Sequence, residues 1–181
     1  MQTATQVQTK WILDPSHSEL VFKVKHLMIS HVKGTFRKFT AIIDGEDFRT
    51  AQIYVNIETD SIFTNDESRD GHLKAADFFD AGQFPTIEFK SSSFKKVDED
   101  NYLLTGQLKI KDISHEMFLN VEFGGVNTDP YGNEKAGFSV SGTLKRSDWG
   151  LNWNAALESG GVLVSDEVKI NAELQFVKKS F

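Results

Sequence analysis

The sequence contains no cysteine and only three prolines in its 181 residues. Without a thiol the protein has no disulfide framework, no thiolate nucleophile and no cysteine-ligated metal site. Because no Pro-, Gly- or Ser-rich linker interrupts the chain, we predict one folded unit. We place a polar N-terminal extension at residues 1–10 and a single domain at residues 11–181.

Long apolar runs and an excess of positive charge are also missing. No stretch approaches the roughly 20 apolar residues that span a bilayer, and residues 1–10 lack the apolar centre of roughly 7 to 15 residues found in signal peptides. The net charge is −6 and the 20 Lys and Arg are scattered, which argues against a nucleic-acid partner. These features predict a cytoplasmic protein without an integral membrane segment. A chain whose signal peptide had been removed would look the same.

Known catalytic and metal-binding motifs are absent from the sequence. It has no Gly-x-Ser-x-Gly elbow, no phosphate-binding glycine loop and no nucleophile with a base nearby. Carboxylates at Asp66, Glu67 and Asp70 could act as acid and base, but at the start of a predicted helix they favour its dipole. We therefore expect no enzymatic activity, no metal and no cofactor. The five histidines show no metal-ligand spacing: His17, His26, His31, His72 and His115.

Alternation of apolar and polar residues dominates the chain and predicts half-buried antiparallel strands. Together with residues 33–45, the apolar faces predict at least eight strands, and strands this numerous must close into a barrel or stack as a sandwich to protect their edges. We expect an all-β, eight-stranded antiparallel barrel. The faces are Leu20, Phe22, Val24 and His26; Ile53, Val55 and Ile57; Ile87 and Phe89; Leu104, Leu108 and Ile110; Met117, Leu119, Val121 and Phe123; Phe138, Val140 and Leu144; and Val168, Ile170, Ala172, Leu174 and Phe176.

Small residues at Gly106, Gly142 and Ala172 interrupt these apolar rows. An eight-stranded barrel is just wide enough to be filled by its side chains or to hold one small ligand. The small residues either leave room inside or mark bulges and sharp twist. Both interpretations stay open at this point.

One segment, Asp66 to Ala81, reads as a helix. Thr64 with Glu67 three residues later predicts a capping box, and Gly82 supplies a stop. Asp70 and Lys74 have the spacing of an ion pair. We expect this helix, through Phe78 and Phe79, to lie across one mouth or one side of the barrel.

Arg146 has the parity of the inward-facing Leu144, so we expect its charge to point inward near a strand end. Such a charge needs a partner, and an ion pair with Asp148, Asp70 or Asp166 is the favoured interpretation. The alternative is a phosphate or another polar head group. Arg69 invites the same two interpretations. Trp149 is expected to plug the barrel end, and Trp153, within residues 151–157, to line the pocket or a lid.

Three ordered sets of residues resemble the YceI-like family, from Trp11 to about Phe176. A conservative departure is Ser114, where many members have threonine. The resemblance implies a lipocalin-like barrel that binds a polyisoprenoid or similar long-chain amphiphile, often as a homodimer. The sets are Trp11, Asp14-Pro15, His17-Ser18, Phe22, Val24, His26, Val32, Gly34 and Phe36; Asp66, Arg69-Asp70, His72-Leu73 and Phe78-Phe79; and Gly137-Phe138, Arg146 to Leu151, Gly161, Val164-Ser165-Asp166 and Val168.

The leading hypothesis is a non-enzymatic carrier or store for such a lipid. The candidate ligand-binding positions are Phe22, Val24, His26, Phe36 and Val55, and the candidate mouth residues that meet the polar head are Arg146, Asp148, Arg69, Asp70 and His26. One alternative is a barrel filled by its own aromatic residues that acts as a stress-related structural or interaction module. Another is an isoprenoid-modifying enzyme that depends on Asp70 or Asp148.

Overall fold

The computed structural model describes residues 6–181, so residues 1–5 of the predicted extension lie outside it. The described chain contains one α-helix, α1 (Glu67–Lys74), and three short 3-10 turns, η1 (Pro15–His17), η2 (Thr59–Ser61) and η3 (Arg146–Trp149). Its strands are β1 (Thr9–Leu13), β2 (Glu19–His26), β3 (Ser30–Phe36), β4 (Phe39–Asp44), β5 (Gln52–Glu58), β6 (Ile62–Phe63), β7 (Thr86–Lys96), β8 (Asn101–Ile110), β9 (Ile113–Thr128), β10 (Glu134–Lys145) and β11 (Val164–Ser180).

The sheet closes on itself as an antiparallel barrel. Each of β1, β4, β5, β7, β8, β9, β10 and β11 pairs with the next, and β11 pairs again with β1. The first part of β11 pairs with β2 and its last part with β1, so β1 and β2 follow one another along the same wall. Similarly, β3 and β4 are separated only by residues 37–38. The predicted eight-stranded barrel with one short helix is therefore confirmed.

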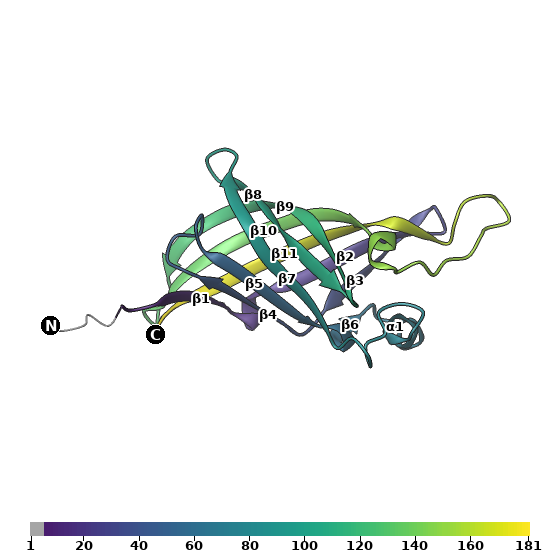
Figure 1. Ribbon diagram of the computed structural model, residues 1–181, viewed down its shortest axis with the longest axis horizontal. Helices are drawn as coiled ribbons and strands as arrows, with labels where there is room; N and C mark the ends of the chain where they lie inside the picture. The colour runs from purple at the N-terminus through teal and green to yellow at the C-terminus, as the bar shows by residue number, and fades with distance from the viewer. Residues whose placement is uncertain (1–5) are drawn as a thin grey trace.

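The barrel is elongated, and its two ends differ (Figure 1). Strands β9 and β11 have 16 and 17 residues, which at about 3.3 Å per residue gives walls roughly 55 Å long. Gln8 and Phe181 exchange backbone hydrogen bonds at one end of the barrel, here called the termini end. Helix α1, the β2–β3 hairpin and the loop of residues 150–163 lie at the opposite end.

Aromatic side chains fill the termini end of the barrel. Phe48, from the loop between β4 and β5, lies with its ring centroid 5.2 Å from both Trp11 and Phe138 and 5.4 Å from Phe123. Phe138 in turn meets Phe176 edge to face, with the ring centroids 5.7 Å apart. Edge-on and tilted contacts of this kind are the favoured aromatic geometries. This half of the barrel is therefore packed by its own side chains.

Two of the small residues in the apolar rows accommodate neighbouring side chains. A Cβ atom at Gly106 would lie 2.5 Å from the ring of Phe89, and one at Gly142 would lie 2.6 Å from Leu119. The ladder between β7 and β8 also shifts register opposite Gly106. Phe89 and Leu119 occupy the space beside these two glycines. Of the two interpretations of the small residues, extra room in a cavity therefore does not apply to Gly106 and Gly142.

The helix is shorter than predicted and begins differently. The residue at its N-cap is Asp66, whose side chain accepts a hydrogen bond from the Arg69 backbone N–H, so the predicted capping box from Thr64 is wrong. Thr64 is buried and donates from its backbone N–H and its hydroxyl to Asp70, which forms no ion pair with Lys74 within residues 6–181. After Lys74 the chain turns, which lets the adjacent rings of Phe78 and Phe79 contact different partners, Trp153 and Phe36.

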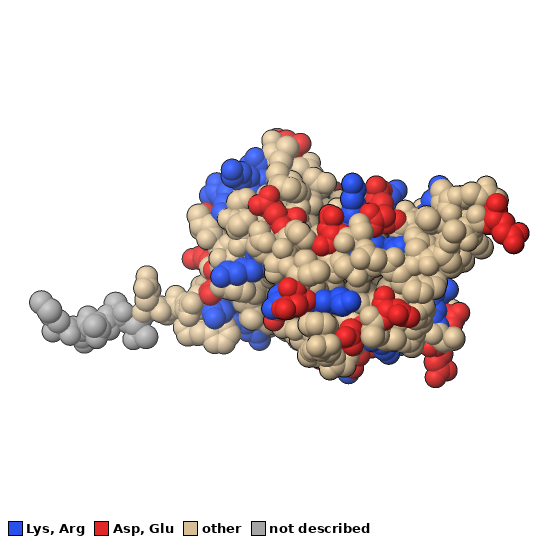
Figure 2. Space-filling model, turned by 45° about the vertical axis from the view of Figure 1, so that its right-hand side comes forward, with Lys and Arg blue, Asp and Glu red and all other residues tan. Residues whose placement is uncertain are grey.

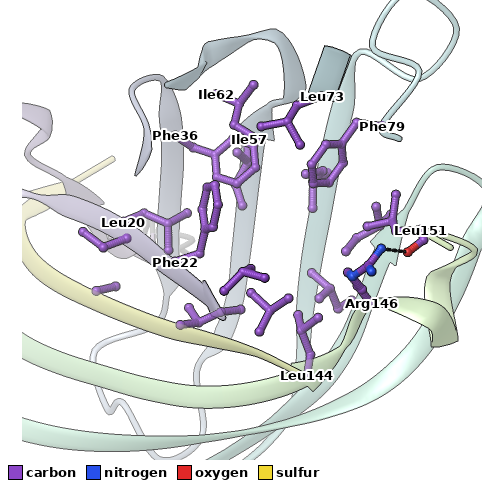
Figure 3. Close-up of a pocket in the computed structure, with 18 of the residues that line it drawn as sticks. Leu20, Phe22, Phe36, Ile57, Ile62, Leu73, Phe79, Leu144, Arg146 and Leu151 are labelled. Atoms are coloured by element: carbon purple, nitrogen blue, oxygen red, sulfur yellow. Dashed lines mark hydrogen bonds between the residues drawn. The ribbon is translucent and has the colours of Figure 1, made fainter. Parts of the chain in front are cut away.

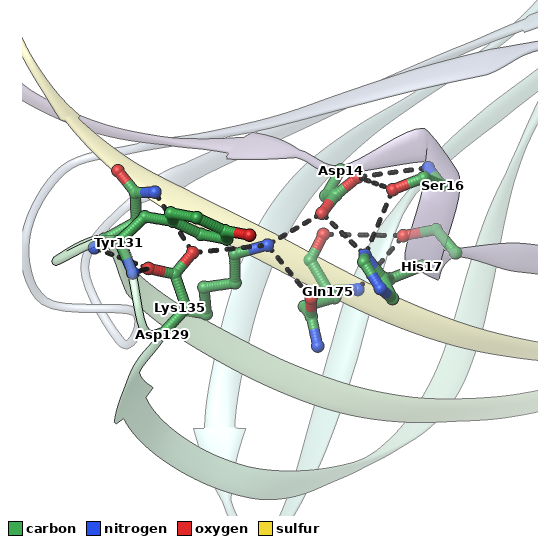
Figure 4. A network of polar contacts seen from close by, with 9 residues as sticks. Asp14, Ser16, His17, Asp129, Tyr131, Lys135 and Gln175 are labelled. Carbon is green, nitrogen blue, oxygen red and sulfur yellow. Dashed lines mark hydrogen bonds and ion pairs between the residues drawn. The ribbon is translucent and has the colours of Figure 1, made fainter.

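A polar network fixes the break between β1 and β2 (Figure 4). Asp14 accepts hydrogen bonds from the backbone N–H and hydroxyl of Ser16, and it lies 2.9 Å from both His17 Nδ1 and Lys135 Nζ. The hydrogen bond from the Ser16 hydroxyl, followed by those of Lys135 and His17, holds the pKa of Asp14 far below its ordinary value. Lys135 also reaches Gln175, so the network joins β10 and β11 to the β1–β2 corner.

Replacing Asp14 by asparagine should therefore lower the free energy of unfolding by about 2 kcal/mol at pH 7, through the loss of charge-assisted hydrogen bonds. Because the folded-state pKa of Asp14 is depressed, its contribution is present above the unfolded pKa of about 3.9 and is lost as pH falls below it. Urea unfolding of both proteins at pH 7 and at acidic pH should show the difference shrinking on acidification. Asp112→Asn, at an exposed turn, is the control; an equal effect there would contradict the assignment.

Candidate functional site

A cavity of about 530 Å³ occupies the half of the barrel that faces α1 (Figure 3). Phe22, Ile57 and Leu144 reach into it from three parts of the wall, while Leu73 and Phe79 cover it from α1 and the turn that follows. Phe176 also lines the cavity and contacts Phe138 of the aromatic half. The packed aromatic half therefore forms the floor of the cavity.

All five positions predicted to bind a ligand line this cavity: Phe22, Val24, His26, Phe36 and Val55. Ala172 lines it as well, in contrast to the two glycines. Phe22 lies against Gly34, its direct partner across the β2–β3 ladder. Because Gly34 has no side chain, the ring can lie close to the strand instead of projecting across the cavity.

Arg146 lines the cavity but does not form the predicted ion pair. Its guanidinium donates to the backbone carbonyls of Leu151 (2.6 Å), Trp153 and Ser165 (both 2.9 Å) and Val164 (3.2 Å). These four hydrogen bonds use all but one of its N–H groups. Arg146 therefore ties the loop of residues 150–163 to the barrel, and at most one donor is left for a ligand.

Asp166 influences the pKa of Arg146 through its charge, without an ion pair between the two side chains. Burial lowers the pKa of Arg146, and the negative charge of Asp166 opposes that shift. Burial alone would raise the pKa of Asp166. The hydrogen bonds that Asp166 accepts from the hydroxyl and backbone N–H of Ser147, together with the charges of Arg146 and Lys145, lower that pKa overall. A guanidinium remains charged throughout the physiological range. The loop is therefore held by a buried cation whose partners are carbonyl dipoles.

The other mouth candidates divide into two groups. His26 and Arg69 line the cavity, whereas Asp70 and Asp148 do not. Arg69 donates to the hydroxyl and the carbonyl of Thr64, so its favoured ion pair is replaced by contacts within its own segment. Asp70 is buried beneath Thr64, and Asp148 is exposed on η3.

Further basic side chains at the mouth were missed by the sequence analysis. Lys25 and His72 line the cavity together with His26, Arg69 and Arg146. Among residues 6–181 the only acidic residue in the lining is Asp66, which caps α1. Strand alternation placed Lys25 on the outer face, but it lies close to the hairpin tip, where an outward side chain still reaches the rim. The mouth therefore carries an excess of positive charge.

The two tryptophans expected near the barrel end have different environments. Trp149 is buried, donates from Nε1 to the Leu108 carbonyl and meets His115 edge-on. Trp153 lines the cavity, and its ring lies 4.9 Å from His72 and 5.5 Å from Phe78, measured between centroids. The first closes the wall, and the second covers the cavity from the loop of residues 150–163.

A second hollow of about 520 Å³ lies outside the barrel wall, where the chain bends between β1 and β2 and between β3 and β4. Its lining is mixed, with Glu19 and Arg37 among the polar residues. Leu20, Phe36 and Phe39 line both this hollow and the main cavity. These three side chains therefore border both spaces.

The YceI-like domain profile matches residues 11–176. The chain belongs to the YceI-like family. A UPF0312 protein of Staphylococcus aureus strain N315 is 41% identical over 171 residues, which cover 93% of this chain and 97% of that protein. Within residues 6–181, no helix is long and apolar enough to cross a bilayer.

Two solved structures of this kind share the fold. BcnA of Burkholderia cenocepacia has a TM-score of 0.78 at 22% identity, over 90% of this chain and 98% of its own. A polyisoprenoid-binding domain from Saccharophagus degradans, implicated in plant cell wall breakdown, has a TM-score of 0.67 at 16% identity, over 92% and 97%. At these identities the likeness establishes the YceI barrel alone.

Replacing Arg146 by methionine should destabilise this end of the barrel, because four carbonyl groups lose their charged donor. We expect the free energy of unfolding to fall by about 3 kcal/mol and hydrogen exchange to accelerate in residues 151–165. Lys145→Met, at the exposed neighbouring position, should leave both unchanged. Equal behaviour of the two variants would show that Arg146 does not hold the loop.

Proposed function

We propose that this protein binds and carries a polyisoprenoid or similar long-chain amphiphile, with the apolar tail in the barrel cavity and the polar head at the basic mouth. The observation that carries the proposal is the apolar cavity inside the barrel, beside the mouth-lining cations Lys25, Arg69 and Arg146. Its volume of about 530 Å³ falls within the range of small-molecule sites, roughly 300 to 1,000 Å³.

The energetics favour a tail-driven ligand. Each methylene group moved from water into the cavity contributes about 0.8 kcal/mol, so a long tail binds well with few polar contacts. Four of the five N–H donors of Arg146 are already used, and two of those of Arg69 bond to Thr64. The polar head is therefore read mainly through charge and the remaining donors, and an anionic head fits best.

A binding role is better supported than catalysis. The isoprenoid-modifying alternative depends on Asp70 or Asp148, and neither lines the cavity. The Asp70 carboxylate is taken up by Thr64. The self-filled alternative accounts for the aromatic half of the barrel but leaves the apolar half beside α1 without an occupant.

Native mass spectrometry of the freshly purified protein, followed by solvent extraction, tests the proposal. We expect the protein to carry one prenyl or acyl molecule per chain, or to take up an added long-chain prenol. Ala172→Phe should abolish uptake, because Ala172 faces the cavity opposite Leu20. Asn171→Phe places the same ring at the adjacent exposed position and should bind normally. A wild-type protein that carries nothing and takes up no prenol would refute the carrier function.

The aromatic floor should set the length of tail that is accepted. Phe176→Ala removes the ring that separates the cavity from Phe138, so longer prenols should gain about fourfold in affinity for each additional methylene that becomes buried. Competition between prenols of different length, read by mass spectrometry, measures this shift. Phe94→Ala is the matched control, since Phe94 is equally buried but lies outside the cavity, stacked on Tyr102. An unchanged length profile in Phe176→Ala would show that the tail ends elsewhere.

A further inference from the structure

Four apolar side chains lie exposed at the end of the barrel opposite the termini. Leu27, Met28 and Ile29 form the turn between β2 and β3 and are 41%, 47% and 83% exposed, and Val162 of the neighbouring loop is 39% exposed. The two segments are joined, since the Leu27 backbone N–H donates to the Leu163 carbonyl at 2.9 Å. We call these four residues the apolar tip. In Figure 2 the lobe at this end is mostly tan, with one red acidic cluster at its outermost point.

The turn of the apolar tip is made of residues that its backbone disfavours. Leu27 and Met28 have φ values of +53° and +61°, and the Ile29 N–H donates to the His26 carbonyl. Two-residue hairpin turns with positive φ strongly favour Asn-Gly or related pairs. Bulky side chains in this conformation cost stability, and such local strain is concentrated at functional positions.

A row of lysines crosses the outer face of the wall behind the tip. Lys169 of β11 pairs directly with Lys23 of β2, which pairs with Lys33 of β3. On the same face, the next pair towards the tip is Lys25 with His31. Like charges directly opposite one another destabilise a sheet, and within residues 6–181 none of these lysines forms an ion pair. We call Lys23, Lys33 and Lys169 the lysine row.

The apolar tip is also the rim of the cavity. Val24, His26 and Val32, on the two strands that lead into the turn, line the cavity, and so do Leu163 and Trp153 of the adjoining loop. Figure 1 shows the hairpin and the loop of residues 150–163 projecting together beyond the barrel wall. The loop carries a single charged residue, Glu158. A surface that meets the tip therefore also meets the mouth.

We propose that the apolar tip and the lysine row dock this protein on a membrane surface rich in anionic phospholipid. Exposed apolar side chains insert at the boundary between head groups and acyl chains, and basic residues behind them are attracted to the negative surface. The proposal extends the carrier function, because docking at the rim would let a lipid pass between bilayer and cavity without crossing water.

The charges favour a membrane over a second copy of the chain as the partner of the tip. A symmetric contact between two tips would bring two lysine rows towards each other, and within residues 6–181 no lysine of a row is held in an ion pair. Acidic head groups would supply counter-charges along the whole row. The partner of the apolar tip is therefore a lipid surface, and self-association through the tip would contradict this.

Flotation with vesicles of phosphatidylcholine, with and without phosphatidylglycerol, tests the docking. We expect wild type to bind the anionic vesicles and to be released by salt. Lys23→Gln and Lys33→Gln should each lower vesicle affinity about fivefold, whereas Lys95→Gln, on the exposed face of β7, should lower it much less. Ile29→Ser should weaken binding to both vesicle types, and Tyr131→Ser, 89% exposed in the β9–β10 turn, should not.

Met28→Asn separates docking from folding. Asparagine tolerates the left-handed backbone, so this variant should unfold at the same or a higher urea concentration than wild type while losing vesicle binding. Vesicle binding by Met28→Asn and Ile29→Ser at the wild-type level would overturn the proposal. So would a wild type that ignores anionic vesicles and forms a dimer that Ile29→Ser dissociates, as measured by light scattering.

Uptake of a prenol delivered from cyclodextrin, with no vesicles present, distinguishes this proposal from the carrier function. The tip variants should take up the prenol normally but extract it slowly from anionic vesicles. Normal uptake without vesicle binding would overturn the docking and leave the carrier function standing. Vesicle binding without any uptake would do the reverse.

Discussion

Closure of the sheet through the ladder between β1 and β11 is the constraint on which the rest of the structure depends. A closed barrel removes exposed strand edges. It also creates an interior that either is filled by the protein's own side chains or has room for a ligand. Eight strands give a diameter at which both outcomes are possible. In this chain the interior is divided, because Phe48 folds in from the loop after β4 to complete an aromatic cluster with Trp11, Phe123 and Phe138 at the termini end. The other half keeps an apolar space beside α1.

This division decides where stability and binding can be placed. The aromatic half and the Asp14 network lie at the same end, where β1, β10 and β11 are joined by both packing and charged hydrogen bonds. The cavity half is closed instead by the short helix α1, by turns and by a loop that Arg146 holds through backbone carbonyls. Segments with few buried apolar contacts open at lower free energy than core strands. By this argument the mouth opens more readily than the floor, which agrees with the proposed binding of a long tail.

The sequence could predict the barrel because period-two alternation is a local signal that survives in nearly every strand. It also indicated the inward faces, so Phe22, Val24, His26, Phe36 and Val55 all line the cavity. It could not predict the partners of Arg146. Parity correctly turned that side chain inward, but its acceptors are carbonyls of a loop, and a carbonyl is present at every residue and leaves no mark in the sequence. The start of the helix was predicted wrongly for a related reason. Thr64 and Asp66 are both good N-cap residues, and tertiary contacts decide between them.

The small residues show why packing cannot be predicted from one strand at a time. Gly106, Gly142 and Ala172 look alike along the sequence, yet a Cβ atom at either glycine would collide with Phe89 or Leu119, whereas Ala172 borders open space. The difference lies in which side chain the neighbouring strand presents, and therefore in the register of the ladders. The same registers align Lys169, Lys23 and Lys33, which are far apart in sequence, into one row. Charges that appeared scattered along the chain become a local excess only after the barrel closes, so a net charge of −6 is compatible with a basic face at the cavity rim.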